Sequence, residues 1–372
     1  MVKRTIVFHN ARVLDPGNGI DRVGDVSVVE GRLVYGPPAA DVDVLHVDCR
    51  GLVLSPAFID LHCHLREPGY EAKETISTGT AAAAAGGFGT VCCMPNTKPA
   101  LDSLESLALL RERIARGASV RVLPIAAVTI GRRGERLVDF DALAAGGVVG
   151  FSDDGEYVWD ACIMRDALRA TLSLGLPVID HAQDGALVAG GVMHDGEVSR
   201  RLGLPGMPAE AEEIAVGRDI ALARLTGGHV HIAHITTARA VEMVRRARDE
   251  GLKVTAEATP HHIFLSDADA MFYGPEGSVR FNPQAKVNPP LRPAADAAAV
   301  LRGLVEGVID AIATDHAPHA GVDKSAAPDR VAFGISGFET ALASMLTLCH
   351  EGPLSLAQVV RGFQRGQRMQ IN

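Results

Sequence analysis

The chain has 372 residues, enough for one large barrel-sized domain with a small companion. Apolar residues make up 47% and charged residues 22%, which excludes a mainly disordered protein. The 36 Lys and Arg residues against 45 Asp and Glu residues give a net charge of −9, which argues against a nucleic-acid partner. Aromatic residues reach only 4% while Gly numbers 39, so aliphatic and small side chains dominate, as is typical of α/β enzymes.

Targeting signals are not readable in the sequence. The first residues include Lys3 and Arg4 but no long apolar stretch or cleavage site of a secretory signal. No apolar run approaches the roughly 18 residues of a membrane helix. The six cysteines form no CxxC pair, so reduced thiols are expected. We therefore expect a cytoplasmic protein with no membrane partner.

The first 55 residues differ from the rest of the chain. Short β-branched runs at residues 5–8 and 25–29 are separated by turn signals at residues 16–19 and 30–31. This pattern predicts a small antiparallel sheet. We predict three parts: a small β domain over 1–55, a barrel over 56–350, and an atypical tail over 351–372.

From residue 57 onward, short apolar runs alternate with helical patterns, which indicates repeated βα units. One helix candidate covers residues 236–250, where Thr236 or Thr237 can cap the start and Gly251 can end it. Eight parallel strands close most economically as a (β/α)₈ TIM barrel. The eight strand candidates end near Leu61, Cys93, Ala127, Phe151, Asp180, Ala233, Glu257 and Thr314.

Polar residues follow these strand ends, at the face where barrel enzymes place catalytic groups. They are His62, His64, Asn96, Asp153, Asp154, His181, His234, His261, His262 and the run from Asp315 to His319.

The most informative pattern is His62-Cys63-His64. Alternation along a strand places both imidazoles on one side, about 6 to 7 Å apart, where they can hold one metal ion. A pair of core histidines is the alternative, but His181, His234 and Asp315 at later strand ends favour zinc or a similar divalent ion.

A carboxylate that bridges two metal ions is expected after the fourth strand. Spacing does not choose between Asp153 and Asp154, and either could instead be a turn residue before Gly155.

Three further residues suggest a reaction on an anionic substrate. Asp315 can be both ligand and general acid/base. Arg66 offers a planar fork for a carboxylate, although alone it would more often form a surface ion pair. Asn96 follows a proline that stiffens its turn and can present an amide to the same pocket.

Other residues receive structural interpretations. His229 and His231 alternate with the metal-site face, so we expect them to pack toward the covering helices. Residues 86–89 (GGFG) precede a strand and lack a P-loop lysine, so they predict a turn. The cysteines Cys63, Cys92 and Cys93 are expected to be small barrel residues.

These motifs together resemble the dihydroorotases of the amidohydrolase superfamily, most closely the bacterial type I enzymes. The matching stretches are residues 60–69 (DLHCHLREPG), 94–97 (MPNT), 286–292 (KVNPPLR), 314–319 (TDHAPH) and 333–339 (FGISGFE). The resemblance runs from about residue 10 to about residue 348. It implies reversible cyclisation of N-carbamoyl-L-aspartate to (S)-dihydroorotate, a step of pyrimidine synthesis.

The resemblance also implies a site with two zinc ions. One would be held by His62, His64 and Asp315 and the other by His181 and His234, with Asp154 and a hydroxide as bridges. No lysine occurs in residues 151–155, so the carbamylated lysine of hydantoinases is not expected. The implied substrate contacts are His64, Arg66, Asn96, Asn288, His319, Phe333 and Gly334.

Two departures from the family pattern matter. Gln183 stands where relatives often carry a glutamate two residues after the histidine. Only 57 residues follow Asp315, and residues 360–368 do not alternate as a strand would. We therefore hypothesise a truncated or frame-altered C-terminus, in which the small sheet of the composite sandwich lacks its usual C-terminal strands and keeps an uncovered face.

Two other functions are weighed against this one. An allantoinase or hydantoinase would act on the same barrel, but Arg66 and Asn96 favour a substrate with a carboxylate. An inactive scaffold for aspartate transcarbamoylase would be expected to lose metal ligands, whereas all six are present. Aspartate transcarbamoylase and further copies of this chain are the candidate protein partners.

Overall fold

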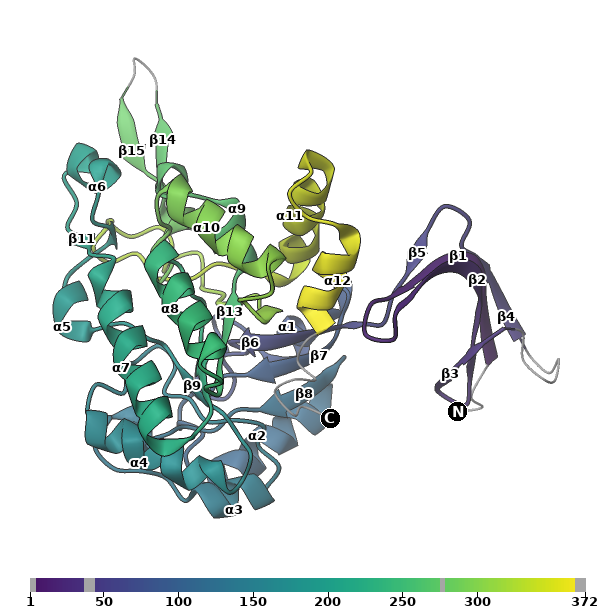
Figure 1. Cartoon of the computed structure of the whole chain (residues 1–372), viewed down its shortest axis with the longest axis horizontal. Helices are drawn as coiled ribbons and strands as arrows, with labels where there is room; N and C mark the ends of the chain where they lie inside the picture. Colours follow the sequence, from purple (N-terminus) through teal and green to yellow (C-terminus); the bar gives the residue numbers. More distant parts are fainter. Residues whose placement is uncertain (1–4, 37–43, 275–277, 365–372) are drawn as a thin grey trace.

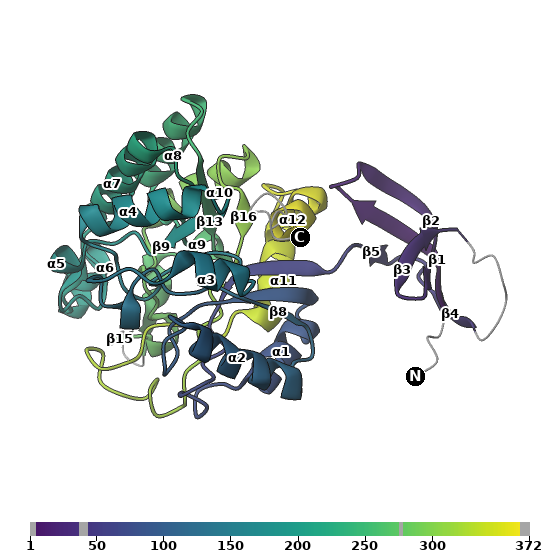
Figure 2. The same cartoon turned by 90° about the horizontal axis from the view of Figure 1, so that it is seen from below.

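The computed structural model describes residues 5–36, 44–274 and 278–364. The chain forms a large body of helices around parallel strands, and a small sheet stands to one side of it (Figures 1 and 2). Within the described residues, no helix combines the length and apolar character needed to cross a membrane.

The small sheet contains strands from the first 54 residues: β1 (Thr5–Asp15), β2 (Ile20–Val29), β3 (Arg32–Tyr35), β4 (Val44–Asp48) and β5 (Val53–Leu54). The strands β1, β2 and β3 pair antiparallel, whereas β4 and β5 pair parallel to β1. The prediction of an antiparallel sheet is therefore wrong for β4 and β5. Turn signals in the sequence mark where strands end, but they do not determine which edge of β1 the returning chain joins.

One face of this sheet has a small core, formed by Ala11, Val13, Val26 and Cys49. Other apolar side chains of the sheet remain exposed, and Val23 is 72% exposed. That C-terminal strands are missing from this sheet stays a prediction.

The large body is built on parallel strands that follow one another round a ring. The strands β6, β7 and β8 pair in that order, and β9, β12, β13 and β16 form a second parallel set. Single bridges from Phe151 to Ala126 and Val178 join the two sets, and a bridge from Cys63 to His316 returns to β6. The predicted mixed α/β class is confirmed. The bounds are β6 (Phe58–Cys63), β7 (Phe88–Cys93), β8 (Arg121–Pro124), β9 (Val178–Asp180), β12 (Val230–Ile232), β13 (Val254–Ala258) and β16 (Ala311–Ile312).

The fourth predicted strand is shorter than expected. Phe151 receives a backbone hydrogen bond from Ile179 (2.8 Å) and donates one to Pro177 (3.1 Å), but no extended strand forms there. The preceding helix ends at Ala145, and Gly147 has φ of 84°, so only four residues remain for the strand.

Helices cover the outside of the ring (Figure 1). The prediction for residues 236–250 is confirmed: α8 begins after Thr237, whose side chain accepts a hydrogen bond from the amide of Ala240, and Gly251 follows with φ of 78°. The covering helices are α1 (Ile76–Ala85), α2 (Leu104–Gly117), α3 (Phe140–Ala145), α4 (Ala161–Leu172), α7 (Glu210–Thr226), α8 (Ala238–Asp249), α10 (Ala294–Val305) and α11 (Phe338–Glu351).

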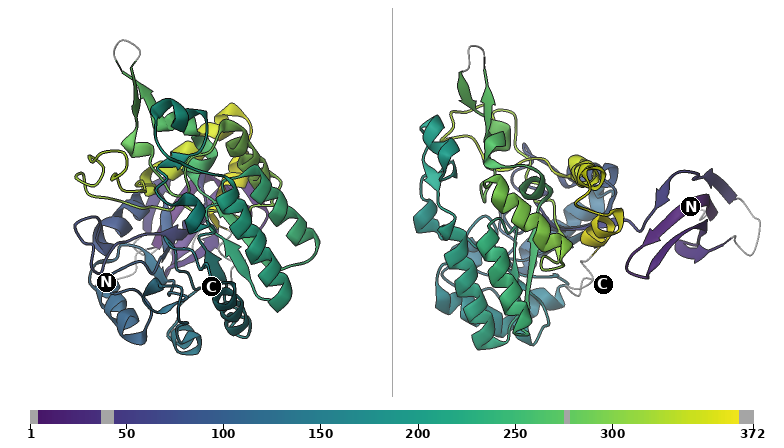
Figure 3. Two further views of the ribbon diagram at one scale, coloured as in Figure 1. Left: turned by 90° about the vertical axis from the view of Figure 1, so that its left-hand side faces the viewer. Right: turned by 45° about the horizontal axis from the view of Figure 1, so that its top comes forward.

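Shorter elements lie in the loops that follow the strands. The strands β14 and β15 form a hairpin that projects from the body in several views (Figures 1 and 3). These loop elements are α5 (Gly185–Val188), β10 (Met193–His194), α6 (Glu197–Leu202), β11 (Gly206–Met207), α9 (Pro260–Phe264), β14 (Met271–Tyr273) and β15 (Val279–Phe281).

The last described element is α12 (Leu356–Gln364), which packs against the ring. Phe363 is fully buried, with its ring centroid 5.0 Å from that of Phe58 and 5.4 Å from that of Phe88. Because these two residues begin β6 and β7, α12 covers the amino-terminal end of those strands. The remainder of the predicted tail, residues 365–372, lies outside the described residues.

Candidate metal and substrate site

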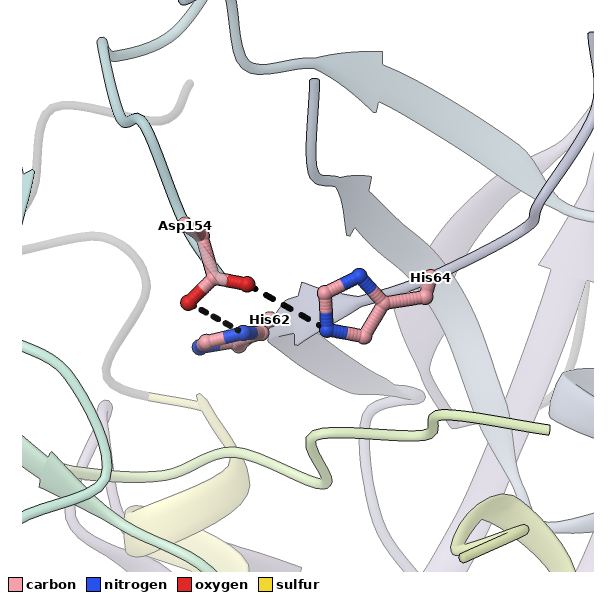
Figure 4. A group of neighbouring side chains, drawn as sticks. All are labelled: His62, His64 and Asp154. Atoms are coloured by element: carbon pink, nitrogen blue, oxygen red, sulfur yellow. Dashed lines mark ion pairs between the residues drawn. The ribbon is translucent and has the colours of Figure 1, made fainter. Parts of the chain in front are cut away.

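Six buried side chains meet at the carboxyl ends of the parallel strands, with Asp154 at the centre. His62 and His64 project from the end of β6 toward this carboxylate (Figure 4). The Nε2 atom of His62 lies 3.3 Å from Asp154 Oδ1, and Nε2 of His64 lies 3.4 Å from Asp154 Oδ2. The strand alternation predicted for this histidine pair therefore places both rings at one site.

Two more histidines approach the same carboxylate. The Nδ1 atom of His181 and the Nε2 atom of His234 each lie 3.5 Å from Asp154 Oδ1. Asp315 completes the cluster, with Oδ1 3.0 Å from Nε2 of His64 and 3.5 Å from Nε2 of His62. Two sets of three candidate ligands thus share Asp154.

The structure distinguishes Asp154 from its neighbour. Asp153 Oδ1 accepts hydrogen bonds from the backbone amides of Val128 (2.9 Å) and Thr129 (3.1 Å), and its other oxygen accepts from the Thr129 hydroxyl. Asp153 therefore anchors the preceding strand end, while Asp154 faces the histidines.

The electrostatics of the cluster favour a bound cation. Burial by itself disfavours a charged carboxylate, but the histidines around Asp154 and Asp315 hold the pKa of each below its usual value. Burial likewise opposes protonation of His62, yet Asp154 and Glu257 raise its pKa well above the usual value. Several buried anions thus surround one small volume.

Unpaired ligand atoms test whether a metal ion fits. Four buried atoms of the cluster make no hydrogen bond within the described residues: His62 Nε2, His181 Nδ1, His234 Nδ1 and Asp154 Oδ1. Buried polar atoms are nearly always satisfied, so these atoms require a partner. Imidazole nitrogens and carboxylate oxygens are donors that zinc accepts, and the donor set fits a divalent ion.

In His62 and His64, the ring nitrogen that points away from the cluster is Nδ1, and a hydrogen bond holds it in place. His62 Nδ1 donates to Glu257 Oε1 (2.7 Å), and His64 Nδ1 donates to the side-chain oxygen of Asn96 (2.9 Å). Each bond places a proton on Nδ1, so Nε2 is the ring nitrogen that faces the cluster and is available to bind a metal ion. Asn96 was predicted to contact substrate, and here it also orients His64.

The expectation that His231 packs toward the covering helices is wrong. Its ring is fully buried, and Nε2 lies 3.2 Å from Glu257 Oε2. His229 and His231 both approach the hydroxyl of Thr255, at 2.8 Å each. The backbone bends after Ile232, where His234 has φ of 30°, so strict alternation does not extend to His234.

Glu257 received no role from the sequence, although it was recognised as a strand end. Its signal is a carboxylate near the end of an otherwise apolar and small-residue strand, Val254–Ala258. Burial opposes its ionisation, but the charge of His62 and the hydrogen bonds from both histidines lower the pKa of Glu257 to about 2.

A cavity of about 220 Å³ opens beside the cluster. Within it, Arg66 Nε donates to the carbonyl of Pro318 (3.2 Å), and the side-chain nitrogen of Asn288 lies 3.1 Å from Nε2 of His181. All the residues predicted to contact substrate line this cavity, namely His64, Arg66, Asn96, Asn288, His319, Phe333 and Gly334.

The backbone is constrained at this site. Arg66, His234 and Asp315 all have positive φ, at 61°, 30° and 45°, a conformation that costs energy for residues other than glycine. Gly334 has φ of 126°, and a Cβ atom there would lie 2.6 Å from the carbonyl oxygen of Ala317. A glycine is therefore required where the chain closes on the cavity.

Comparison with known proteins shows the family. Residues 51–240 match the "Dihydro-orotase-like" family model. A dihydroorotase of Solibacter usitatus is 46% identical over 363 residues, which cover 97% of this chain and 83% of that protein. The chain belongs to the dihydroorotase family. A second dihydroorotase, from Anaeromyxobacter sp. strain K, is 44% identical and covers 97% of this chain and 82% of its own length.

Solved structures with the same fold include a hydantoinase and a dihydropyrimidinase. L-Hydantoinase from Arthrobacter aurescens superposes with a TM-score of 0.84 at 20% identity, covering 98% of this chain and 82% of that one. Dihydropyrimidinase from Brevibacillus agri has a TM-score of 0.80 at 22% identity, covering 96% and 80%. At this identity the likeness concerns the fold alone, whereas the prediction of the dihydroorotase family is confirmed.

Proposed function

We propose that this chain catalyses the reversible cyclisation of N-carbamoyl-L-aspartate to (S)-dihydroorotate, as a cyclic amidohydrolase of pyrimidine biosynthesis. The observation that carries the proposal is the position of Arg66 in the same cavity as the Asp154 cluster. A reaction centre for an amide and a fixed cation for a carboxylate thus lie within one pocket, and both substrate and product carry these two groups.

The cofactor in this proposal is a pair of zinc ions in each subunit. His62, His64 and Asp315 would hold one, His181 and His234 the other, and Asp154 would lie between them. When bound, such ions supply Lewis acidity toward the amide carbonyl and increase the acidity of water. The orphaned atoms of His62, His181 and Asp154 support this assignment.

The remaining residues of the cavity hold the substrate. We assign Arg66 to the substrate carboxylate, and Asn96, Asn288 and His319 to the polar edge of the ring. Phe333 and Gly334 cover the ring from the loop that closes the cavity. These contacts place the reacting amide beside the carboxylates of the cluster, and this positioning accounts for their share of catalysis.

Asp315 moves the proton. In the hydrolytic direction, a water oxygen attacks the ring carbonyl carbon, the C–N bond breaks, and the proton lost by water passes through Asp315 to the leaving nitrogen. The neighbouring histidines hold the pKa of Asp315 below its usual value, so the carboxylate is ionised before it accepts that proton.

The proposal also includes the division of the chain into functional parts, the cellular location and the protein partners. The functional parts are a small β domain over 1–55, a barrel over 56–350 and a tail over 351–372. The protein acts in the cytoplasm, and its candidate partners are aspartate transcarbamoylase and further copies of itself. The complete set of six ligands supports an active enzyme over an inactive scaffold.

The test is hydrolysis of dihydroorotate, followed by ultraviolet absorbance, with the purified protein and its measured zinc content. Asp315→Asn is expected to lose about 10³-fold or more in kcat, because it removes the proton carrier. Asp249→Asn, at an exposed end of α8, is the matched control and keeps full activity. Absence of turnover in a zinc-loaded protein, or equal rates for both variants, contradicts the proposal.

A further inference from the structure

Glu257 connects two distant histidines inside the ring of strands. It projects from β13, accepts from His62 of β6 through Oε1 at 2.7 Å, and lies 3.2 Å from Nε2 of His231 of β12 through Oε2. The side chains of Glu257, His62 and His231 are each no more than 1% exposed. Water is therefore excluded from this arrangement, and the low local dielectric strengthens both contacts, the one with His62 being the shorter.

The acceptors in these contacts determine which ring nitrogens of His62 and His231 carry protons. A carboxylate only accepts, so His62 carries its proton on Nδ1 and His231 carries one on Nε2. The free Nδ1 of His231 then accepts from the hydroxyl of Thr255 at 2.8 Å. Nε2 of His62 is then the ring nitrogen that can bind a metal ion, and it faces Asp154 at 3.3 Å.

Among the residues that the structure describes, no carboxylate bonds the second ring nitrogen of His181 or His234 in this way. His181 turns Nδ1 toward Asp154, and its Nε2 lies near two neutral amides, Gln183 Oε1 at 3.4 Å and Asn288 Nδ2 at 3.1 Å. A carboxylate raises the basicity of a ligating imidazole more than an amide does. His62, which is bonded to a carboxylate, is therefore the more basic metal ligand, and His181, which lies beside amides, is the less basic one.

We propose that Glu257, held by His231, is a positioning residue that fixes the ring and proton of His62 and thereby strengthens the metal position built on His62 and His64. This inference rests on the proposed function in one respect, that the site binds metal. Glu257 does not touch the substrate cavity, and it acts entirely through His62.

The primary experiment measures zinc affinity by chelator competition for the wild type and Glu257→Gln. The glutamine keeps the size of the side chain and an acceptor for His62 but removes the charge. We expect zinc held at the tighter position to bind about 10- to 100-fold more weakly. Cobalt substitution gives a second readout, because the absorption bands of the ion at the His62 position will change in energy or intensity.

Two variants act as controls. Gln183→Glu introduces a carboxylate beside His181 and is expected to increase zinc affinity at the other position. His231→Leu removes the group that holds Glu257 and is expected to weaken zinc binding in the same direction as Glu257→Gln but by a smaller factor. If Glu257→Gln does not fold, His231→Leu decides the question with the same two readouts.

The outcomes separate this inference from the proposed function. Unchanged zinc affinity and unchanged cobalt bands, with only a lower unfolding temperature of the metal-free variant, would assign Glu257 a structural role and overturn the inference. Loss of zinc affinity in Glu257→Gln together with a wild type that does not hydrolyse dihydroorotate would support the inference while contradicting the proposed function.

Discussion

The guanidinium nitrogen Nη2 of Arg66 lies 3.4 Å from Nε2 of His319, although 253 positions separate the two residues in the sequence. His319 Nε2 also lies 2.7 Å from the carbonyl oxygen of Phe333, and a carbonyl only accepts, so this nitrogen carries the proton. The Arg66 contact is therefore an approach of two donors. Because the His319 proton is already bonded to Phe333, Nη2 of Arg66 is the donor of this pair that is available to an anion in the cavity. Burial together with Arg66 lowers the pKa of His319 to about 4.

Replacing Arg66 tests its role as the carboxylate partner. We expect Arg66→Lys to raise KM for dihydroorotate about 10- to 100-fold, because a lysine cannot reproduce the planar fork. Zinc content should stay unchanged. The half-buried pair of Arg165 with Asp166, on the outer helix α4, provides a control, since Arg165→Lys should leave KM as it is. A fall in kcat with constant KM would place Arg66 in the chemical step instead.

Lys324 holds the loop that closes the cavity. Its ammonium donates to the carbonyls of Ala332 (3.0 Å) and Gly334 (2.9 Å), and burial lowers its pKa to about 8. Lys324→Met leaves these carbonyls without a donor, which costs about 1 to 3 kcal/mol for a buried group.

The expected result for Lys324→Met is a KM about 10-fold higher and faster proteolysis between residues 320 and 336. Limited digestion with and without substrate analogue, beside steady-state kinetics, measures both. The exposed Lys253 supplies a matched lysine-to-methionine control. Wild-type digestion and KM in Lys324→Met would show that the loop is held by its other contacts.

The environment of His194 predicts that the folded protein loses stability in acid. Burial and the neighbouring Arg292, whose Nη1 donates to Nδ1 of His194 at 3.1 Å, lower its pKa to about 4. An unfolded histidine titrates near 6.5, so between these values the unfolded state binds a proton that the folded state does not. The stability that the folded protein gains from a neutral His194 is fully present above about pH 6.5 and is lost as the pH falls through about 4.

Urea unfolding of the metal-free protein from pH 7 to pH 4 measures this effect. In His194→Gln, which retains an acceptor for Arg292, the fall in unfolding free energy over this range should be smaller by about 1 to 2 kcal/mol. Parallel curves for the wild type and the variant would contradict the assigned contribution of His194.

Phe363 tests the contribution of α12. The side chain is fully buried between Phe58 and Phe88, and truncating a buried phenylalanine typically costs about 3 to 5 kcal/mol. We expect Phe363→Ala to lower the unfolding free energy by about that amount, while Arg361→Ala, exposed on the same helix, changes it little. An effect of Phe363→Ala below about 1 kcal/mol would mean that α12 separates from the ring readily.

Local rules were sufficient for much of the candidate site. Three features depend only on residues close together in the sequence, whose geometry a strand or helix determines. They are the alternation of His62 and His64, the polar residues at strand ends and the capping of α8 by Thr237. The five signature stretches added the residues of the cavity, and the structure brings all of them together.

Other features depended on contacts between distant parts of the chain. The sequence left Asp153 and Asp154 equivalent, and only the backbone amides of Val128 and Thr129 determine that Asp153 turns away. Alternation predicted the wrong environment for His231, because the backbone bends after Ile232 and the alternation of β12 does not extend to His234.

By itself, the sequence determined the order of the strands and the chemical types available at their ends. The tertiary structure decided which of these groups meet: Glu257 with His62, Asp154 with four histidines, and α12 with the start of β6. The physical reason is that backbone periodicity is local, whereas the pairing of buried polar groups is fixed by the register of a ring that closes over more than 250 residues.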